Sequence, residues 1–125
     1  MNIITTSFEG LYVLQTINHQ DNRGGFQKLF NSETFQSLGL SVDFAEMYYS
    51  VNKKDVLRGM HFQTPPYDHD KMVYVSAGKI LDVVVDIRKS SKTYGKYLRC
   101  CPCFNPKVPN WDLRIFLYSS FVNLN

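Results

Sequence analysis

Two side chains that can share acid–base chemistry lie near the middle of this sequence. His61 ends the stretch LRGMH, and Lys71 opens the stretch KMVYV, with a Pro65-Pro66 loop between them. A neutral histidine can take a proton near pH 7, and a lysine ammonium can stabilise negative charge forming on a carbonyl oxygen. Together they suit proton abstraction next to a ketone. A lone histidine on a strand is more often packed or solvated than catalytic, so the pair alone does not decide the function.

The elements that must position this pair are predicted to be short, neighbouring strands. Residues 56–62 form one strand, and residues 71–75 form the next after the proline loop, which cannot supply ladder N–H groups. Ala77-Gly78 is predicted to turn the chain as a hairpin into a long apolar strand over residues 80–88.

One geometric condition applies to the first of these strands. Strict alternation puts Arg58 and His61 on opposite faces, because they are three residues apart. Both can line one pocket only if a bulge near Gly59 redirects one of them.

The rest of the chain also reads as strands and turns. Residues 11–17, 26–30 and 44–52 are predicted strands, and Ser32 is predicted to cap the single short helix, which runs to residue 38. Residues 90–95 form a loop. Short strands joined by turns, with one helix, predict an all-β sandwich or barrel.

A second pair of candidate residues lies in the segment DNRGGF. Asp21, Asn22 and the glycine pair favour a bend, so Arg23 is placed on a turn and Phe26 begins the next strand. A phenylalanine close to an exposed arginine could stack a base while the guanidinium holds a phosphate. A core phenylalanine beside a solvated arginine explains the same residues.

Composition limits the classes of protein that this chain can belong to. Its 125 residues, 44% of them hydrophobic, fit one globular domain spanning residues 1–125. The net charge of +3 is spread along the chain, without the Lys/Arg runs of a nucleic-acid or membrane-surface binder. The N-terminus does not resemble a signal peptide and there is no apolar run of membrane-spanning length, so a cytoplasmic protein is expected.

Metal binding is not favoured by the pattern of ligands. Cys100, Cys101 and Cys103 are clustered without a second ligand pair, which favours reduced thiols over a zinc site or a disulfide framework. Small metal-binding barrels usually place a second histidine two positions after the first. Here that position is Gln63, and His69 lies beyond the proline loop, so a metal-free site is predicted.

Three blocks of sequence resemble a known family. DNRGGF, SVNKKDVLRGMHFQTPP and KMVYVSAGKILDVVVDIRKSSKTYG occur in the order found in the dTDP-4-dehydrorhamnose 3,5-epimerase family, and the resemblance covers most of residues 8–97. Members of that family are metal-free cupins that need no cofactor and act on nucleotide-linked 4-keto-6-deoxy sugars. The resemblance implies a cupin-like, double-stranded β-helix (jelly-roll) barrel and a nucleotide-sugar substrate.

The resemblance also implies roles for particular residues. His61 matches the general base that removes protons next to the C4 ketone, and Lys71 matches the lysine that stabilises the enolate. Arg58 resembles the arginine that contacts the diphosphate or sugar. Arg23 and Phe26 resemble the pair that holds the nucleotide, and because family members are dimers that exchange N-terminal strands, this pair is expected to serve a partner's pocket.

Some substrate-contacting positions differ from the family pattern. Lys28 stands where glutamate is frequent, and Glu46 and Tyr48 stand where glutamine and asparagine are usual. A changed sugar, nucleotide or positional outcome is therefore an alternative, including ketoisomerases and mono-epimerases.

Residues 99–125 diverge from the family and contain none of its later motifs. Either the family-like region, residues 1–98, is an incomplete barrel with an unrelated tail, or residues 113–118 supply a closing strand. The family's second histidine, tyrosine acid and base-orienting aspartate have no match. Asp82 or Asp86 could replace that aspartate only if its side chain faces the pocket.

The expected function is epimerisation of a dTDP-4-keto-6-deoxyhexose, in deoxysugar biosynthesis for surface polysaccharide. Two further hypotheses remain open. The chain could be a nucleotide-sugar-binding remnant without catalysis, or a β-barrel interaction module that binds no nucleotide.

Overall fold

The computed structural model describes residues 1–100, 114–119 and 121–124. The described chain is mostly strands with one short helix, as the sequence predicted. In chain order the elements are β1 (Asn2–Thr5), β2 (Leu11–Gln15), β3 (Asn18–Asp21), β4 (Gly24–Gln27), α1 (Ser32–Ser37), β5 (Gly59–His61), β6 (Asp70–Val73), β7 (Asp82–Asp86), β8 (Tyr97–Cys100), β9 (Arg114–Ser119) and β10 (Phe121–Leu124).

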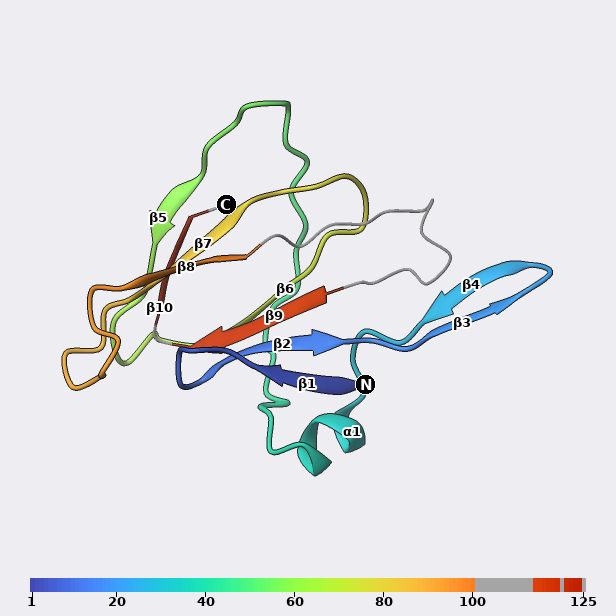
Figure 1. Ribbon diagram of the computed structural model, residues 1–125, viewed down its shortest axis with the longest axis horizontal. Helices are drawn as coiled ribbons and strands as arrows, with labels where there is room; N and C mark the ends of the chain where they lie inside the picture. The colour runs from blue at the N-terminus through green and yellow to red at the C-terminus, as the bar shows by residue number, and fades with distance from the viewer. Residues whose placement is uncertain (101–113, 120, 125) are drawn as a thin grey trace.

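The strands form two four-stranded antiparallel sheets and a separate hairpin (Figure 1). The first sheet has the order β1-β2-β9-β6, and the second has the order β5-β10-β7-β8. The hairpin β3-β4 extends away from both sheets (Figure 1). No helix among the described residues is long and apolar enough to cross a membrane.

One apolar cluster joins the two sheets. Leu11 of the first sheet packs with Val84 and Cys100 of the second, and Phe8 closes the cluster. Around it lie Val13 and Val73 from the first sheet and Leu98 from the second. The inner faces of the two sheets therefore point toward each other across this cluster.

Helix α1 covers the opposite face of the first sheet. Phe35 is fully buried against Leu14 and Ile115, which belong to neighbouring strands of that sheet. The helix begins with Asn31 as its N-cap, since Asn31 Oδ1 accepts the Thr34 N–H at 3.0 Å. The sequence prediction of Ser32 as the cap was therefore wrong by one residue.

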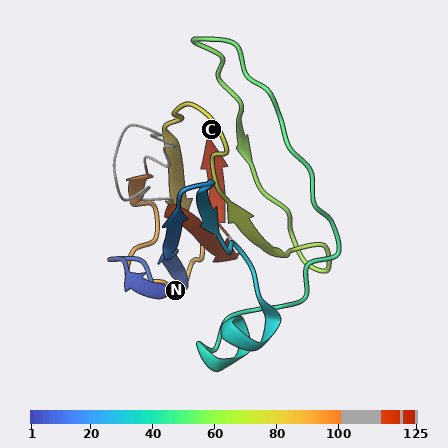
Figure 2. The same cartoon turned by 90° about the vertical axis from the view of Figure 1, so that its right-hand side faces the viewer.

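Two other local predictions were wrong. Residues 44–52 form no strand, and Figure 2 shows residues 41–58 as a long loop beside the sheets. Ala77-Gly78 does not close a hairpin, because β6 belongs to the first sheet and β7 to the second. The turn instead carries the chain from one layer to the other.

Residues 114–119 are part of the folded sheet. β9 lies between β2 and β6, with Leu11 paired to Tyr118 and Lys71 paired to the same residue. Of the two alternatives for residues 99–125, the one in which residues 113–118 contribute a strand agrees with this structure.

Candidate functional site

β5 carries His61 at one edge of the second sheet. Its Cα pairs with Asn123 of β10, which pairs in turn with Val84 of β7. Residues directly opposite each other across antiparallel strands present their side chains on the same face. Val84 is fully buried between the sheets. His61 is in the same cross-strand row as Val84, so the exposed His61 lies on the face of the second sheet that points toward the first.

The register of β5 is irregular between Gly59 and His61. These two residues pair with adjacent residues of β10, which leaves Met60 as an extra residue on β5. The bulge lies where the sequence argument required one for Arg58 and His61 to share a face.

β6 carries Lys71 at the edge of the first sheet. Lys71 pairs with Tyr118 of β9, and Tyr118 pairs with Leu11 of β2. Leu11 is fully buried in the cluster between the sheets. The half-buried Lys71 is therefore on the inner face of the first sheet, together with Val73.

His61 and Lys71 thus face the space between the sheets from opposite sides. The prediction that they lie on neighbouring strands was wrong in one respect, because β5 and β6 are consecutive in the chain but pair within different sheets. The segment between them contains the double proline, and its Tyr67 N–H donates to the Thr64 carbonyl at 2.9 Å.

Asp82 is the first of two buried carboxylates on the inner face of β7. Its side chain is fully buried, and neither carboxylate oxygen has a hydrogen-bond partner within the described residues. Burial raises the pKa of the Asp82 carboxyl from 3.8 to about 6, because water no longer solvates the charged form. The dipole of the adjacent Val83 amide and the charge of the Lys71 ammonium oppose this rise, although the Val83 N–H does not have the geometry of a hydrogen bond to either oxygen.

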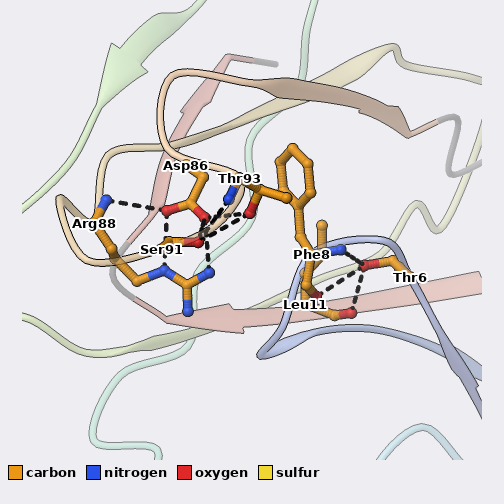
Figure 3. Close-up of polar contacts among 7 residues, drawn as sticks. All are labelled: Thr6, Phe8, Leu11, Asp86, Arg88, Ser91 and Thr93. Atoms are coloured by element: carbon orange, nitrogen blue, oxygen red, sulfur yellow. Dashed lines mark hydrogen bonds and ion pairs between the residues drawn. The ribbon is translucent and has the colours of Figure 1, made fainter.

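Asp86, the second buried carboxylate, is fully hydrogen-bonded (Figure 3). The Arg88 guanidinium donates from Nε to Oδ1 and from Nη2 to Oδ2, both at 2.9 Å. The hydroxyls of Ser91 and Thr93 each donate to Oδ2 at 2.6 Å. These donors, Arg88 above all, hold the pKa of Asp86 well below its usual range. Asp86 is therefore committed to the β7–β8 loop and is not available to orient His61.

Arg23 and Phe26 lie on the projecting hairpin. Arg23 occupies the turn, as predicted, and its Nη2 lies 2.6 Å from Asp21 Oδ2 in an exposed ion pair. Phe26 is 62% exposed and pairs across the hairpin with His19. The hairpin extends from the far side of the molecule from β5 (Figure 1), so a single chain does not bring this pair to His61.

The remaining predicted binding residues lie in the loop over residues 41–58. Glu46 is exposed and Tyr48 is 79% exposed. Arg58 Nε donates to Asn52 Oδ1 at 2.6 Å, and this hydrogen bond connects the two sides of the turn over residues 53–57. The structure does not bring Glu46 or Tyr48 into a packed site within one chain.

A shallow surface hollow of about 500 Å³ lies on the other face of the second sheet. Its lining includes Leu81, Val83 and Val85, which alternate with Asp82 along β7. This hollow is therefore separated from the inner face that carries the candidate site. No group of three metal-ligating side chains occurs within the described residues.

Comparison with known proteins decides the family. Residues 5–101 match the family model described as dTDP-4-dehydrorhamnose 3,5-epimerase. The chain belongs to this family. A dTDP-4-dehydrorhamnose 3,5-epimerase from Escherichia coli K12 is 40% identical over 123 residues, which is 98% of this chain. The chain spans 66% of that enzyme's length.

Solved structures of epimerases have the same fold. An epimerase from Mycobacterium tuberculosis superposes with a TM-score of 0.85 and 30% identity, covering 99% of this chain and 60% of that one. An epimerase from Legionella pneumophila, solved with dTDP-4-keto-L-rhamnose, gives a TM-score of 0.77 at 30% identity over 98% of this chain and 68% of that one.

The difference between Asp82 and Asp86 in this epimerase-family chain is only partly predictable from the sequence. The sequence offers Asp82 and Asp86 as alternatives for one role, because both fall on one face of the apolar strand predicted over residues 80–88. The sequence signal that separates them is local: Arg88, Ser91 and Thr93 follow Asp86 closely, whereas Asp82 has no such donors nearby.

Proposed function

We propose that this chain epimerises a dTDP-4-keto-6-deoxyhexose by removing a proton from a carbon next to the C4 ketone. Membership of the epimerase family supports the reaction class. One observation carries the proposal for this chain. His61 on β5 and Lys71 on β6 lie on the inner faces of the two sheets, so both face the space between them.

The proposed chemistry follows from these two groups. The neutral imidazole of His61 takes a proton from C3 or C5, and the electrons of that C–H bond move to form an enolate at C4. The Lys71 ammonium stabilises the negative oxygen. A proton that comes from solvent is delivered to the opposite side of the ring and inverts the carbon, and His61 returns the abstracted proton to solvent. The electrons of the broken C–H bond stay within the sugar as the enolate, so this deprotonation route needs no redox cofactor. The site is proposed to work without a metal.

Five further residues are proposed to hold the substrate. Arg58 would contact the diphosphate or the sugar, and Glu46 and Tyr48 would contact the sugar from the same loop. Arg23 and Phe26 would hold the nucleotide by charge and stacking.

We also propose that the working form is a homodimer. The hairpin carrying Arg23 and Phe26 projects from the sheets on the side away from β5 (Figure 1), which supports its insertion beside a partner's site. A two-stranded hairpin with an exposed aromatic side chain is only marginally stable alone. The proposed fold is one cupin-like, jelly-roll domain over residues 1–125, in the cytoplasm.

Proton exchange with solvent tests the proposed reaction. The purified chain is incubated in D2O with dTDP-4-keto-6-deoxyglucose, and the C3 and C5 proton signals are followed by NMR. Exchange is expected for the wild type, and His61→Asn and Lys71→Met are each expected to slow it by about 100-fold or more. Binding of dTDP should stay within about twofold in both variants, since neither residue is proposed to hold the nucleotide. Exchange by His61→Asn at the wild-type rate would exclude His61 as the base.

A second candidate function is nucleotide-sugar binding without catalysis. Among the described residues, no carboxylate forms a hydrogen bond with the exposed His61 ring, so no such partner fixes the orientation of the imidazole. Binding of dTDP by the wild type with no deuterium exchange would select this function. Arg23→Ala should then weaken dTDP binding, whereas His61→Asn should leave it unchanged.

A further inference from the structure

Asp82 is an unusual residue for the interior of a small β protein. It is fully buried on the inner face of β7, and both of its oxygens lack a hydrogen bond among the described residues. A buried carboxylate without donors lowers the stability of a fold, because nothing replaces the water that it loses. An unsatisfied group of this kind calls for a physical explanation.

The surroundings of Asp82 supply one opposite charge. Lys71 lies on the inner face of the first sheet, and its ammonium is the cation that favours the ionised form of Asp82. The next carboxylate along β7, Asp86, is already saturated by Arg88, Ser91 and Thr93. Asp82 lies on the same face of β7 as Val84, and Lys71 lies in the same row as Leu11, which packs against Val84. Asp82 is thus the buried carboxylate of β7 that faces the lysine of the candidate site and is not already held by donors.

We propose that Asp82 is a positioning residue that acts through Lys71. Its carboxylate provides a negative charge on the inner face opposite Lys71, which attracts the ammonium and holds it directed into the space between the sheets. The substrate does not touch Asp82, since its side chain is buried. This inference rests on the proposed epimerase function, in which Lys71 stabilises the enolate.

The first test separates positioning from folding by comparing kcat with KM. Asp82→Asn keeps the shape of the side chain and removes its charge. We expect kcat for exchange to fall by about 10-fold to 100-fold, with KM within about twofold, because the enolate carries more charge than the ketone. The matched control is Val84→Ala, a neighbouring buried position on the same face of β7. This control should lower stability by leaving a cavity and should leave kcat within about twofold.

The second test does not depend on activity. A double-mutant cycle compares the effect of Asp82→Asn on the unfolding equilibrium in the wild type and in Lys71→Met. If the two charges interact, removing Asp82 should stabilise the Lys71→Met background more than the wild type, by about fivefold or more in the unfolding constant.

These results keep the two proposals distinct. A wild type without exchange would remove the epimerase proposal, while the unfolding cycle would still report on the Asp82–Lys71 interaction. A cycle with no coupling, or a kcat for Asp82→Asn within twofold of wild type, would overturn the inference about Asp82. A fall in kcat of similar size in Val84→Ala would also overturn it, because that variant lowers stability but keeps the charge of Asp82.

Discussion

Asp82 and Asp86 occupy equivalent positions on one strand and have opposite environments. Both are fully buried on the inner face of β7, four residues apart. Asp86 accepts hydrogen bonds from the backbone and side chain of Arg88 and from two hydroxyls (Figure 3). Asp82 accepts none from the described residues. Burial alone therefore does not determine what a carboxylate does in this fold, because its donors set the sign of its contribution to stability.

The largest expected effect is the loss of the satisfied carboxylate. Asp86→Ala should lower the free energy of unfolding by about 3 kcal/mol, because it leaves the Arg88 guanidinium and two hydroxyls without their acceptor. This value is at the low end for a broken buried pair, since Arg88 keeps 29% of its side chain exposed. Urea unfolding near pH 7.5 measures it.

Asp21 provides the matched control for this change. It forms a similar two-point contact with Arg23, but the pair is exposed on the hairpin. Asp21→Ala should leave the free energy of unfolding unchanged within error. Equal losses in the two variants would show that burial does not strengthen the Asp86 network.

The second expected effect has the opposite sign. Near pH 7.5, Asp82→Asn should raise the free energy of unfolding by about 2 kcal/mol, because the folded chain no longer holds an ionised carboxylate without donors. This gain in unfolding free energy is smaller than the free energy that corresponds to the whole pKa shift, since the new amide is also buried without partners. A loss of stability in this variant would mean that Asp82 has a structural partner.

The pH dependence of stability should separate the two residues further. The pKa of Asp82 is raised from 3.8 to about 6 on folding, so the stability that it contributes in the protonated form is lost as pH rises from about 4 to 6. The stabilisation by Asp82→Asn should therefore be about 2 kcal/mol near pH 7.5 and close to zero near pH 4. Unfolding curves across this range measure the difference, and a gain that is constant with pH would contradict the assignment.

Asp86 should show the reverse behaviour. Folding lowers its pKa, so its stabilisation is present above pH 4 and is lost as the pH falls below that value. In Asp86→Asn the loss of unfolding free energy below pH 4 should become smaller. The decrease in unfolding free energy as the pH rises from 4 to 6, which comes from Asp82, should remain. An unchanged loss of unfolding free energy below pH 4 would show that other carboxylates account for it.

The smallest expected effect concerns the geometry of the Asp86 pair. Arg88→Lys keeps the charge but cannot donate from two nitrogens in the planar arrangement seen at Nε and Nη2. We expect a loss of about 1 kcal/mol by urea unfolding, because the two hydroxyls remain bound to Asp86. A loss as large as that of Asp86→Ala would mean that Arg88 alone holds the network.

The same contrast explains which parts of the fold were predictable. The turn at Arg23 and the short helix depend on neighbouring residues, and both were found close to their predicted positions. The Asp86 network is local as well, since all its donors lie within the next seven residues. Features that depend on nearby sequence can be inferred from the sequence.

Features that depend on the partner of a strand were not predictable in this way. The turn at Ala77-Gly78 specifies a change of direction, but it does not specify whether the next strand stays in the same sheet. Alternating residues over 44–52 suggested a strand, yet Tyr49 is 89% exposed and no ladder forms there. The placement of Asp82 and Lys71 on facing inner surfaces depends on the packing of two sheets, which alternation along one strand does not reveal.

The most direct test of the account is the isotopic composition of the keto sugar after incubation in D2O with the wild-type chain. Mass spectrometry of recovered dTDP-4-keto-6-deoxyhexose should show deuterium at C3, at C5 or at both, because proton abstraction and return from solvent is the proposed chemistry of His61 and Lys71. Recovered sugar without deuterium, from a sample in which dTDP binding has been demonstrated, would contradict the account.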